Sequence, residues 1–304
     1  MSLADVTQLR NGGLFPMIGL GTYLLNDAQA EEATINALRI GYIHIDTAEF
    51  YKNHDGIRSG IKASGIDRSK IFITDKVAPD AGSWGIWKNY NQVIESCKLH
   101  LKKLGTEYVD LYLIHHAYAG KQRVEQWRAM CDLKRDGLVK HIGVSNFSQA
   151  HIEELRSAGL EMPEVNQIEI HPMCTQTALV AYCIENGILP VAYSSLAPAT
   201  TWRTEPNQRS SKTSETCTST SKLGSLIEEL TQKYAVSEAQ LLLKWALQHG
   251  YPILPKSCRQ ERLAENANLF GFTINVDDIK RLDACDENAP LAWPQMNPLE
   301  APME

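Results

Sequence analysis

Four residues with reactive side chains stand at or just beyond the ends of three predicted strands. Asp46 and Tyr51 lie in GYIHIDTAEFYKN, where an apolar strand gives way to a polar turn. Lys76 ends the strand IFITDK, and His115 ends the strand VDLYLIH. A carboxylate, a phenol, an ammonium and an imidazole that share one small volume suit proton transfer to a carbonyl oxygen. The question is whether the fold brings them together.

Each of the four would have its own task in such a reaction. A phenol has an ordinary pKa of about 10 and is a weak acid near neutrality. A nearby ammonium favours the phenolate, so we expect Lys76 to lower the pKa of Tyr51, while Asp46 holds the lysine in place. His115 would orient the substrate oxygen by a hydrogen bond. Tyr51 would then be the general acid or base.

Each residue also has a purely structural interpretation. Asp46 suits the cap of a loop or helix, Tyr51 suits a half-buried packing position, and Lys76 suits an ordinary ion pair. His115 and His116 could be two histidines of the core or its rim. The coincidence of four such groups at successive strand ends favours a catalytic site.

The three strands belong to a regular alternation of strands and helices. A hairpin turned at Asn11-Gly12-Gly13 leads into a first buried strand. Seven more predicted strands follow at 43–46, 71–76, 109–115, 140–145, 165–170, 188–194 and 252–256. Helical patterns lie between and after them at 27–39, 54–64, 88–104, 123–135, 148–158, 175–186, 223–234, 237–249 and, as the last helix, 259–268.

This alternation predicts an α/β fold with parallel strands and right-handed crossovers. Eight units in 304 residues indicate a single domain over 1–304, a closed (β/α)8 TIM barrel with an N-terminal hairpin. The alternative is an open doubly wound sheet, which calls for a GxGxxG turn after the first strand. The nearest match, GLGTYL at 19–24, lacks the third glycine.

A barrel would direct the polar strand ends toward one shared site. Because side chains alternate along a strand, Asp46 and Lys76 are expected to face inward, and Asp75 to face the outer helices. His44 would lie one layer deeper, as a structural residue of the barrel core.

Composition excludes several other classes of protein. Hydrophobic residues make up 43% of the chain, enough for a large core. The net charge of −6 argues against nucleic acid as a partner. Seven cysteines without a CxxC pair indicate free thiols in a reducing compartment. Without an apolar signal core or a membrane-spanning run, we expect a soluble cytoplasmic protein with no membrane partner. Neither HExxH nor CxxC occurs, so we expect no catalytic metal.

One segment departs from this composition. Twelve of the 23 residues in 200–222 are Ser or Thr. Such a segment is typical of a surface loop. Because it follows a strand end directly, it could instead be a flap over a ligand.

Taken together, these motifs resemble the aldo-keto reductase family over about residues 14–295 of the chain. The segments that carry the resemblance are IGLGTY, GYIHIDTAEFYKN, FITDK, DLYLIH, IGVSNF, NQIEIHP, AYSSL and LPKSCRQERLAEN. The resemblance implies a (β/α)8 barrel that reduces aldehydes and ketones with a nicotinamide cofactor. It also maps the catalytic tetrad of the family onto Asp46, Tyr51, Lys76 and His115.

The resemblance further implies where the nicotinamide end of the cofactor binds. Family contacts to the carboxamide fall on Ser145, Asn146 and Gln167, and the aromatic that stacks on the ring falls on Tyr193. The full set of expected contacts at this end is Gly21, Thr22, Tyr23, Asp46, Ser145, Asn146, Gln167, Tyr193, Ser194 and Leu196.

The adenosine end of the cofactor is expected on the segment from 256 to 266. Two cations and a hydroxyl there suit a dianionic 2′-phosphate, which favours NADP(H) over NAD(H). The expected contacts at this end are Lys256, Ser257, Cys258, Arg262, Glu265 and Asn266. The resemblance also implies that residues 196–222 cover the bound cofactor.

The expected substrate, a small carbonyl compound or alcohol, would touch Tyr23, Tyr51, His115, His116 and Trp293. Ala78 and His116 stand where the family often has larger apolar residues, so the substrate pocket is expected to be wider and more polar. The short stretch at 116–127 is expected to leave the site open on one side.

Two functions remain at this stage. The first is an NADPH-dependent carbonyl reductase that acts as a monomer, with Tyr51 as the general acid. The second is a nicotinamide-binding accessory or regulatory subunit with little turnover.

Overall fold

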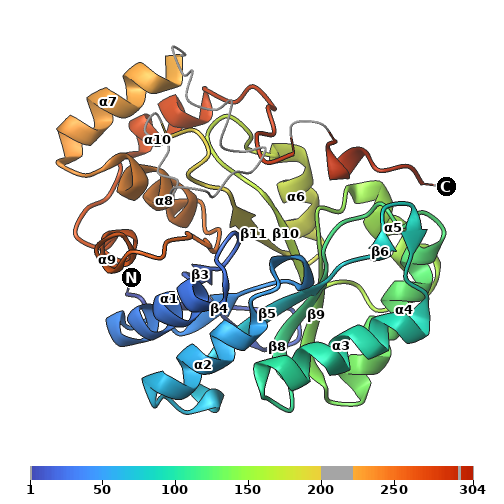
Figure 1. Cartoon of the computed structure of the whole chain (residues 1–304). Helices are drawn as coiled ribbons and strands as arrows, with labels where there is room; N and C mark the ends of the chain where they lie inside the picture. The colour runs from blue at the N-terminus through green and yellow to red at the C-terminus, as the bar shows by residue number, and fades with distance from the viewer. Residues whose placement is uncertain (1, 200–221, 294–295, 304) are drawn as a thin grey trace.

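The computed structural model describes residues 2–199, 222–293 and 296–303 (Figure 1). Its strands are β1 (Val6–Gln8), β2 (Leu14–Pro16), β3 (Leu20–Gly21), β4 (His44–Asp46), β5 (Phe72–Val77), β6 (Asp80–Ser83), β7 (Ile86–Trp87), β8 (Val109–Ile114), β9 (Val139–Ser145), β10 (Val165–Glu169) and β11 (Leu189–Tyr193). Its α-helices are α1 (Asp27–Ile40), α2 (His54–Ser64), α3 (Tyr90–Leu104), α4 (Gln122–Arg135), α5 (Gln149–Ser157), α6 (Thr177–Glu185), α7 (Lys222–Tyr234), α8 (Glu238–Gln248), α9 (Gln260–Ala267) and α10 (Val276–Asp283). Short 3-10 turns lie at η1 (Glu49–Tyr51), η2 (Arg68–Lys70) and η3 (Pro298–Glu300).

Seven parallel strands curl into a barrel in the order β3-β4-β5-β8-β9-β10-β11. The segment around Ile253 closes it, with parallel bridges from Ile253 to Ile18 on one side and to Ala192 on the other. Gly21 lies close against this closing segment, since a Cβ there would be 2.7 Å from the Leu254 carbonyl oxygen. The predicted (β/α)8 barrel is confirmed, and Figure 1 shows its helices around the outside.

Alternation along the strands divides the core into an inner and an outer layer. Leu111 and Leu113 of β8 cluster inside the barrel with Phe15, whereas Tyr112 and Ile114 pack outward with the helices. Phe15 belongs to the hairpin of β1 and β2, whose strands pair antiparallel. The predicted N-terminal hairpin is therefore confirmed, and its buried side chain fills the barrel interior.

Helix α3 shows how local sequence sets an element that matters for the site. Asn89 and Gln92 form a capping box at its start, and Gly105 ends it in the left-handed region at a φ of 65°. Val93 and Cys97 lie on its buried face. His100 lies on the same face and is buried too.

The structure differs from the sequence prediction in three elements. The predicted strand at 252–256 is present only as isolated bridges at Ile253 and Lys256. Helix α9 is not the last, because α10 follows it with Asn275 as its N-cap. Strands β6 and β7 form an antiparallel hairpin that the sequence analysis did not predict. The glycines that shape this hairpin, Gly82 and Gly85, have φ values of 87° and 89°.

Two other expectations concern the chain as a whole. Of the Ser/Thr-rich stretch, residues 200–221 lie outside the described residues, so its predicted covering role stays a prediction. Within the described part of the chain, no helix is long and apolar enough to cross a membrane.

Candidate active site

Asp46 and Lys76 meet inside the barrel at the carboxyl ends of β4 and β5. Lys76 Nζ donates to Asp46 Oδ1 at 2.5 Å and to the Thr47 carbonyl oxygen at 2.9 Å. Gln167 Nε2, from β10, donates to Asp46 Oδ2 at 2.8 Å. Burial raises the pKa of Asp46, and the charge of Lys76 and these hydrogen bonds oppose that rise. The result is a buried ion pair whose carboxylate has both oxygens engaged.

Tyr51 lies beside this pair, on the turn η1. Lys76 Nζ is 5.1 Å from the centre of the Tyr51 ring. The ring also packs against Tyr23 at 5.1 Å and against His115 at 5.7 Å, between ring centres. The structure therefore brings together the four side chains that the sequence analysis selected as a tetrad.

The electrostatics of Tyr51 differ from the expectation. Burial raises its pKa well above the ordinary value, and the carboxylates of Asp46 and Asp75 add to the effect. The charge of Lys76 does not offset this rise. The expectation that Lys76 lowers the pKa of Tyr51 is wrong in this structure. The phenol keeps its proton at neutral pH, as a proton donor must.

A chain of hydrogen bonds crosses the mouth of the barrel. Trp293 Nε1 donates to Tyr193 Oη at 2.9 Å, and that hydroxyl donates to Asn146 Oδ1 at 2.7 Å. Asn146 Nδ2 donates to the His115 carbonyl oxygen at 3.0 Å. Ser145 Oγ donates to the Gln167 carbonyl oxygen at 2.8 Å. The amide and hydroxyl groups expected at the nicotinamide end thus stand side by side.

Two of these positions have unusual backbone conformations. Asn146 follows β9 with a φ of 59°, and Ser194 follows β11 with a φ of 55°. Residues other than glycine rarely adopt this left-handed region of backbone conformation, and those that do cluster at functional sites.

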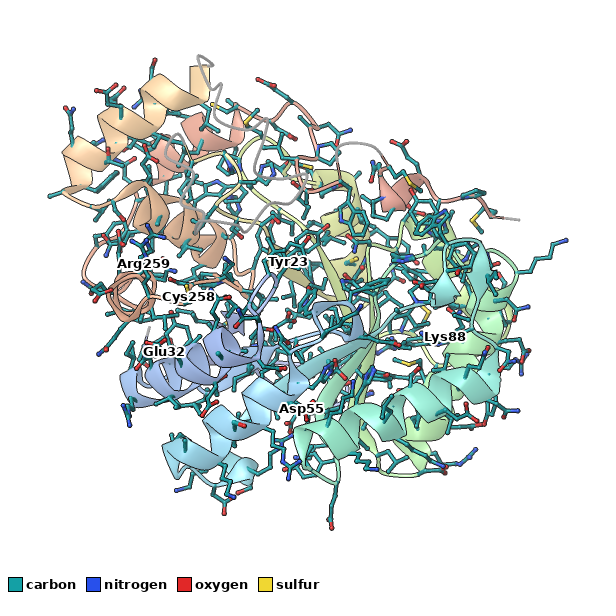
Figure 2. All side chains as sticks on the ribbon, viewed as in Figure 1. Tyr23, Glu32, Asp55, Lys88, Cys258 and Arg259 are labelled. Atoms are coloured by element: carbon teal, nitrogen blue, oxygen red, sulfur yellow. The ribbon has the colours of Figure 1, made fainter. Side chains whose placement is uncertain are left out.

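A cavity of about 440 Å³ extends from the tetrad to the other end of the site. Its lining includes most of the predicted cofactor contacts: Gly21, Thr22, Tyr23, Asp46, Ser145, Asn146, Gln167, Tyr193, Ser194, Leu196, Lys256, Arg262 and Asn266. Tyr51, His115 and Trp293 line it as well. The lining does not include Ser257, Cys258 and Glu265. Glu265 lies on α9, and Ser257 and Cys258 come shortly before this helix; Figure 2 labels Cys258.

His116 lies behind the cavity and not on its wall. Its side chain is covered by the rings of Phe50, Trp84 and Trp293, with centres 6.0, 5.6 and 6.2 Å away. Burial lowers the pKa of His116 to about 3, with a further contribution from Lys88, so the ring is neutral. The hairpin of β6 and β7 supplies Trp84 on the side where the sequence analysis expected an open, more polar wall.

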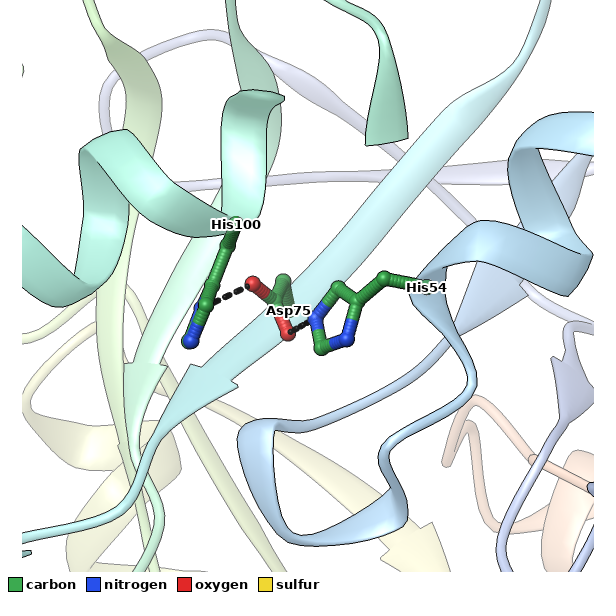
Figure 3. Close-up of side chains that lie close together, drawn as sticks. All are labelled: His54, Asp75 and His100. Carbon is green, nitrogen blue, oxygen red and sulfur yellow. Dashed lines mark hydrogen bonds and ion pairs between the residues drawn. The ribbon is translucent and has the colours of Figure 1, made fainter. Parts of the chain in front are cut away.

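A second charged cluster lies on the outer side of β5, and the sequence analysis missed it. His54 Nε2 bonds Asp75 Oδ1 at 3.0 Å, and His100 Nδ1 bonds Asp75 Oδ2 at 2.7 Å (Figure 3). Each of these three residues has one atom that could bind a metal ion, and the three atoms lie within 4.8 Å of one another. The outward direction of Asp75 was expected. The overlooked signal was His100, a polar residue on the apolar face of α3.

The comparisons with known proteins agree with this geometry. The profile of the aldo/keto reductase family matches residues 17–287. The chain belongs to this family. The family prediction is confirmed, and with it the assignment to the oxidoreductases. Aldo-keto reductases use NADP(H), the cofactor that the sequence analysis favoured.

Several aldo-keto reductases are similar along nearly their whole length. The glyoxal reductase of Bacillus subtilis is 36% identical over 94% of this chain and 95% of its own. The methylglyoxal reductase DkgA of Escherichia coli is 31% identical over 96% and 97%. Among solved structures, the Bombyx mori aldo-keto reductase in complex with NADP has a TM-score of 0.82 and 30% identity over 98% of this chain and 99% of its own.

Proposed function

We propose that this aldo-keto reductase reduces an aldehyde or ketone to an alcohol with NADPH, and that Tyr51 donates the proton to the carbonyl oxygen. The observation that carries the proposal is a protonated phenol on the wall of a cavity, beside the buried Asp46–Lys76 pair. General acid catalysis requires such a donor within hydrogen-bond reach of the reacting oxygen.

The residues of the cavity fit a phosphorylated dinucleotide. Cationic Lys256 and Arg262 line one end, and the amides of Asn146 and Gln167 line the other. This order suits a 2′-phosphate at the first end and a carboxamide at the second. Tyr193 would stack on the nicotinamide ring at the second end. NADPH, when bound, supplies the hydride for the carbonyl carbon.

The protein residues have separate tasks in the reduction. Tyr51 gives its proton to the developing alkoxide, and His115 orients the same oxygen. Lys76 fixes the position of the phenol by its charge and is itself fixed by Asp46. Tyr51 is half-buried on the cavity wall, so its phenol is accessible to a bound carbonyl group.

The aromatic lining at the mouth of the cavity favours a substrate with an apolar substituent. Phe50 and Trp293 line it next to His115, and Trp84, which is 55% exposed, extends the same aromatic wall outward. Flat apolar groups pack well on such rings. The Bacillus subtilis and Escherichia coli relatives are named for glyoxal and methylglyoxal. For this protein we expect a higher kcat/KM with benzaldehyde than with glyoxal.

The test is the loss of NADPH absorbance with a panel of aldehydes and ketones. Tyr51→Phe should lower kcat/KM about 100- to 10,000-fold on an active substrate, because it removes the proton donor. Tyr182→Phe, which removes a phenol bonded to Glu153 on an outer helix, is the matched control and should keep full activity. Full turnover by Tyr51→Phe would overturn the mechanism. Tight NADPH binding without turnover of any carbonyl would favour the accessory subunit instead.

A further inference from the structure

The turn that carries Tyr51 is held before and after this residue by contacts to β5 and to Ala78, which directly follows β5. Two residues before Tyr51, Glu49 Oε2 accepts from the backbone N–H of Ala78 at 2.9 Å. Three residues after it, His54 Nε2 bonds Asp75 Oδ1 at 3.0 Å. Asp75 and Ala78 flank Lys76 on the same stretch of chain. The outer contacts therefore set where the phenol lies relative to the ammonium inside the barrel.

His100, from α3, lies between the two carboxylates of these contacts. Its Nδ1 is 2.7 Å from Asp75 Oδ2, and its Nε2 is 3.8 Å from Glu49 Oε2. Lys88 Nζ, on the other side of Glu49, is 3.1 Å from both of its oxygens and also bonds the Ala78 carbonyl oxygen at 2.7 Å. One helix thus links the contact before Tyr51 to the contact after it.

The polar groups that face His100 come from several elements. They are Asp75 of β5, Glu49 of η1, His54 of α2, Lys88 before α3, and Tyr112 of β8, whose hydroxyl is 3.3 Å from His100 Nδ1. Burial disfavours a charged imidazole, but the two carboxylates outweigh burial and raise the pKa of His100. With His100 protonated, two anions and two cations balance in this cluster.

We propose that Glu49, Asp75 and His54 form a network that positions Tyr51 against Lys76, with protonated His100 as its central positioning residue. The inference rests on the proposed function, because positioning matters only if Tyr51 donates the proton. Each of the two imidazole nitrogens lies at hydrogen-bond distance from its own oxygen of Asp75, so hydrogen bonds account for the geometry of the cluster. A neutral His100 would leave the two carboxylates with the single charge of Lys88, and the turn would loosen.

The test is a double-mutant cycle on the outer face of β5. Asp75→Asn and His100→Gln should each lower the single-turnover rate of hydride transfer about 10- to 100-fold, because small displacements at a reacting centre have effects of this size. The dissociation constant of NADPH should not change. The double variant Asp75→Asn/His100→Gln restores charge balance, so it should lose less than the product of the single losses, by at least about fivefold.

The matched control is His141→Gln at the opposite end of the barrel. His141 Nδ1 is 2.7 Å from the buried carboxylate of Glu164, so the variant removes a similar bond far from Tyr51. It should lower stability and leave the hydride-transfer rate unchanged. If the network were purely structural, Asp75→Asn and His100→Gln would also lower stability and leave the hydride-transfer rate unchanged.

Four results would overturn the inference. The first is an unchanged rate in folded Asp75→Asn and His100→Gln, and the second is a double variant whose loss is the product of the single losses. If these variants do not fold, neutron diffraction of the wild-type protein at pH 8 decides: a bare nitrogen on His100 contradicts the proposal, and deuterium on both nitrogens supports it.

A nearly inactive Tyr51→Phe beside fully active outer variants leaves the proposed function standing and removes this inference alone. A fully active Tyr51→Phe removes both.

Discussion

Both faces of β5 carry a cluster of charged side chains, but among the described residues only the inner cluster borders a cavity. Lys76 faces inward to Asp46, and its neighbour Asp75 faces outward to His54 and His100. Both β5 side chains are fully buried. The inner pair stands beside a cavity and a phenol that keeps its proton, whereas α2 and α3 cover the outer cluster. Access to a cavity and a transferable proton therefore distinguish the cluster proposed as catalytic from the cluster proposed to support it.

The largest expected effect is on the inner face. Lys76→Met removes the cation that holds Asp46 and faces the Tyr51 ring, so kcat should fall about 100- to 1,000-fold, within the range of acid–base catalysis. Steady-state rates at saturating NADPH measure it. Lys244→Met is the matched control, since it removes a buried ammonium that bonds the Leu269 carbonyl oxygen, and its kcat should be unchanged. A smaller loss in Lys76→Met than in Asp75→Asn would reverse the ranking of the two faces.

The next effect is at the far end of the inner cavity. Arg262→Ala removes a cation from the expected 2′-phosphate site, so the KM for NADPH should rise about 10- to 100-fold, as expected for a charged hydrogen bond. The KM for NADH should stay the same, because NADH has no phosphate there. Arg259→Ala changes an exposed neighbour outside the cavity lining and serves as the control. An equal rise for both cofactors would place the phosphate elsewhere.

The smallest expected effect is a pH dependence of protein stability caused by His100 in the outer cluster. Because the pKa of His100 is raised on folding, this residue stabilises the protein below its ordinary pKa of 6.5, and the contribution is lost as pH rises through the folded pKa. Between these values its share of the unfolding free energy should fall by up to about 1.4 kcal/mol per pH unit. Urea unfolding across this range measures the slope. His100→Gln should lack that component, and an identical slope in both proteins would show that His100 is neutral.

The sequence allowed the inner face to be predicted almost completely. The alternation of side chains along β4 and β5 is enough to direct Asp46 and Lys76 inward once the strands are recognised. The motifs then locate Tyr51 and His115 at neighbouring strand ends. These inferences succeed because strand geometry fixes direction locally.

The outer face and the energetics depend on tertiary contacts that no local pattern specifies. His100 reaches Asp75 only because α3 packs against β5, although its position on the buried face of α3 was a usable sign. The pKa of Tyr51 was predicted in the wrong direction because desolvation depends on how deeply the ring is buried. Trp84 lies over His116 on the side that looked open, because the hairpin of β6 and β7, which depends on two glycines in the left-handed region, places it there.

The most direct test of the central claim is a crystal structure with NADPH and an unreactive carbonyl substrate analogue. The account predicts that the analogue's carbonyl oxygen lies about 2.6–3.2 Å from Tyr51 Oη, the reach of a proton donor. An oxygen bonded to water or to His115 alone, with Tyr51 out of reach, would contradict it.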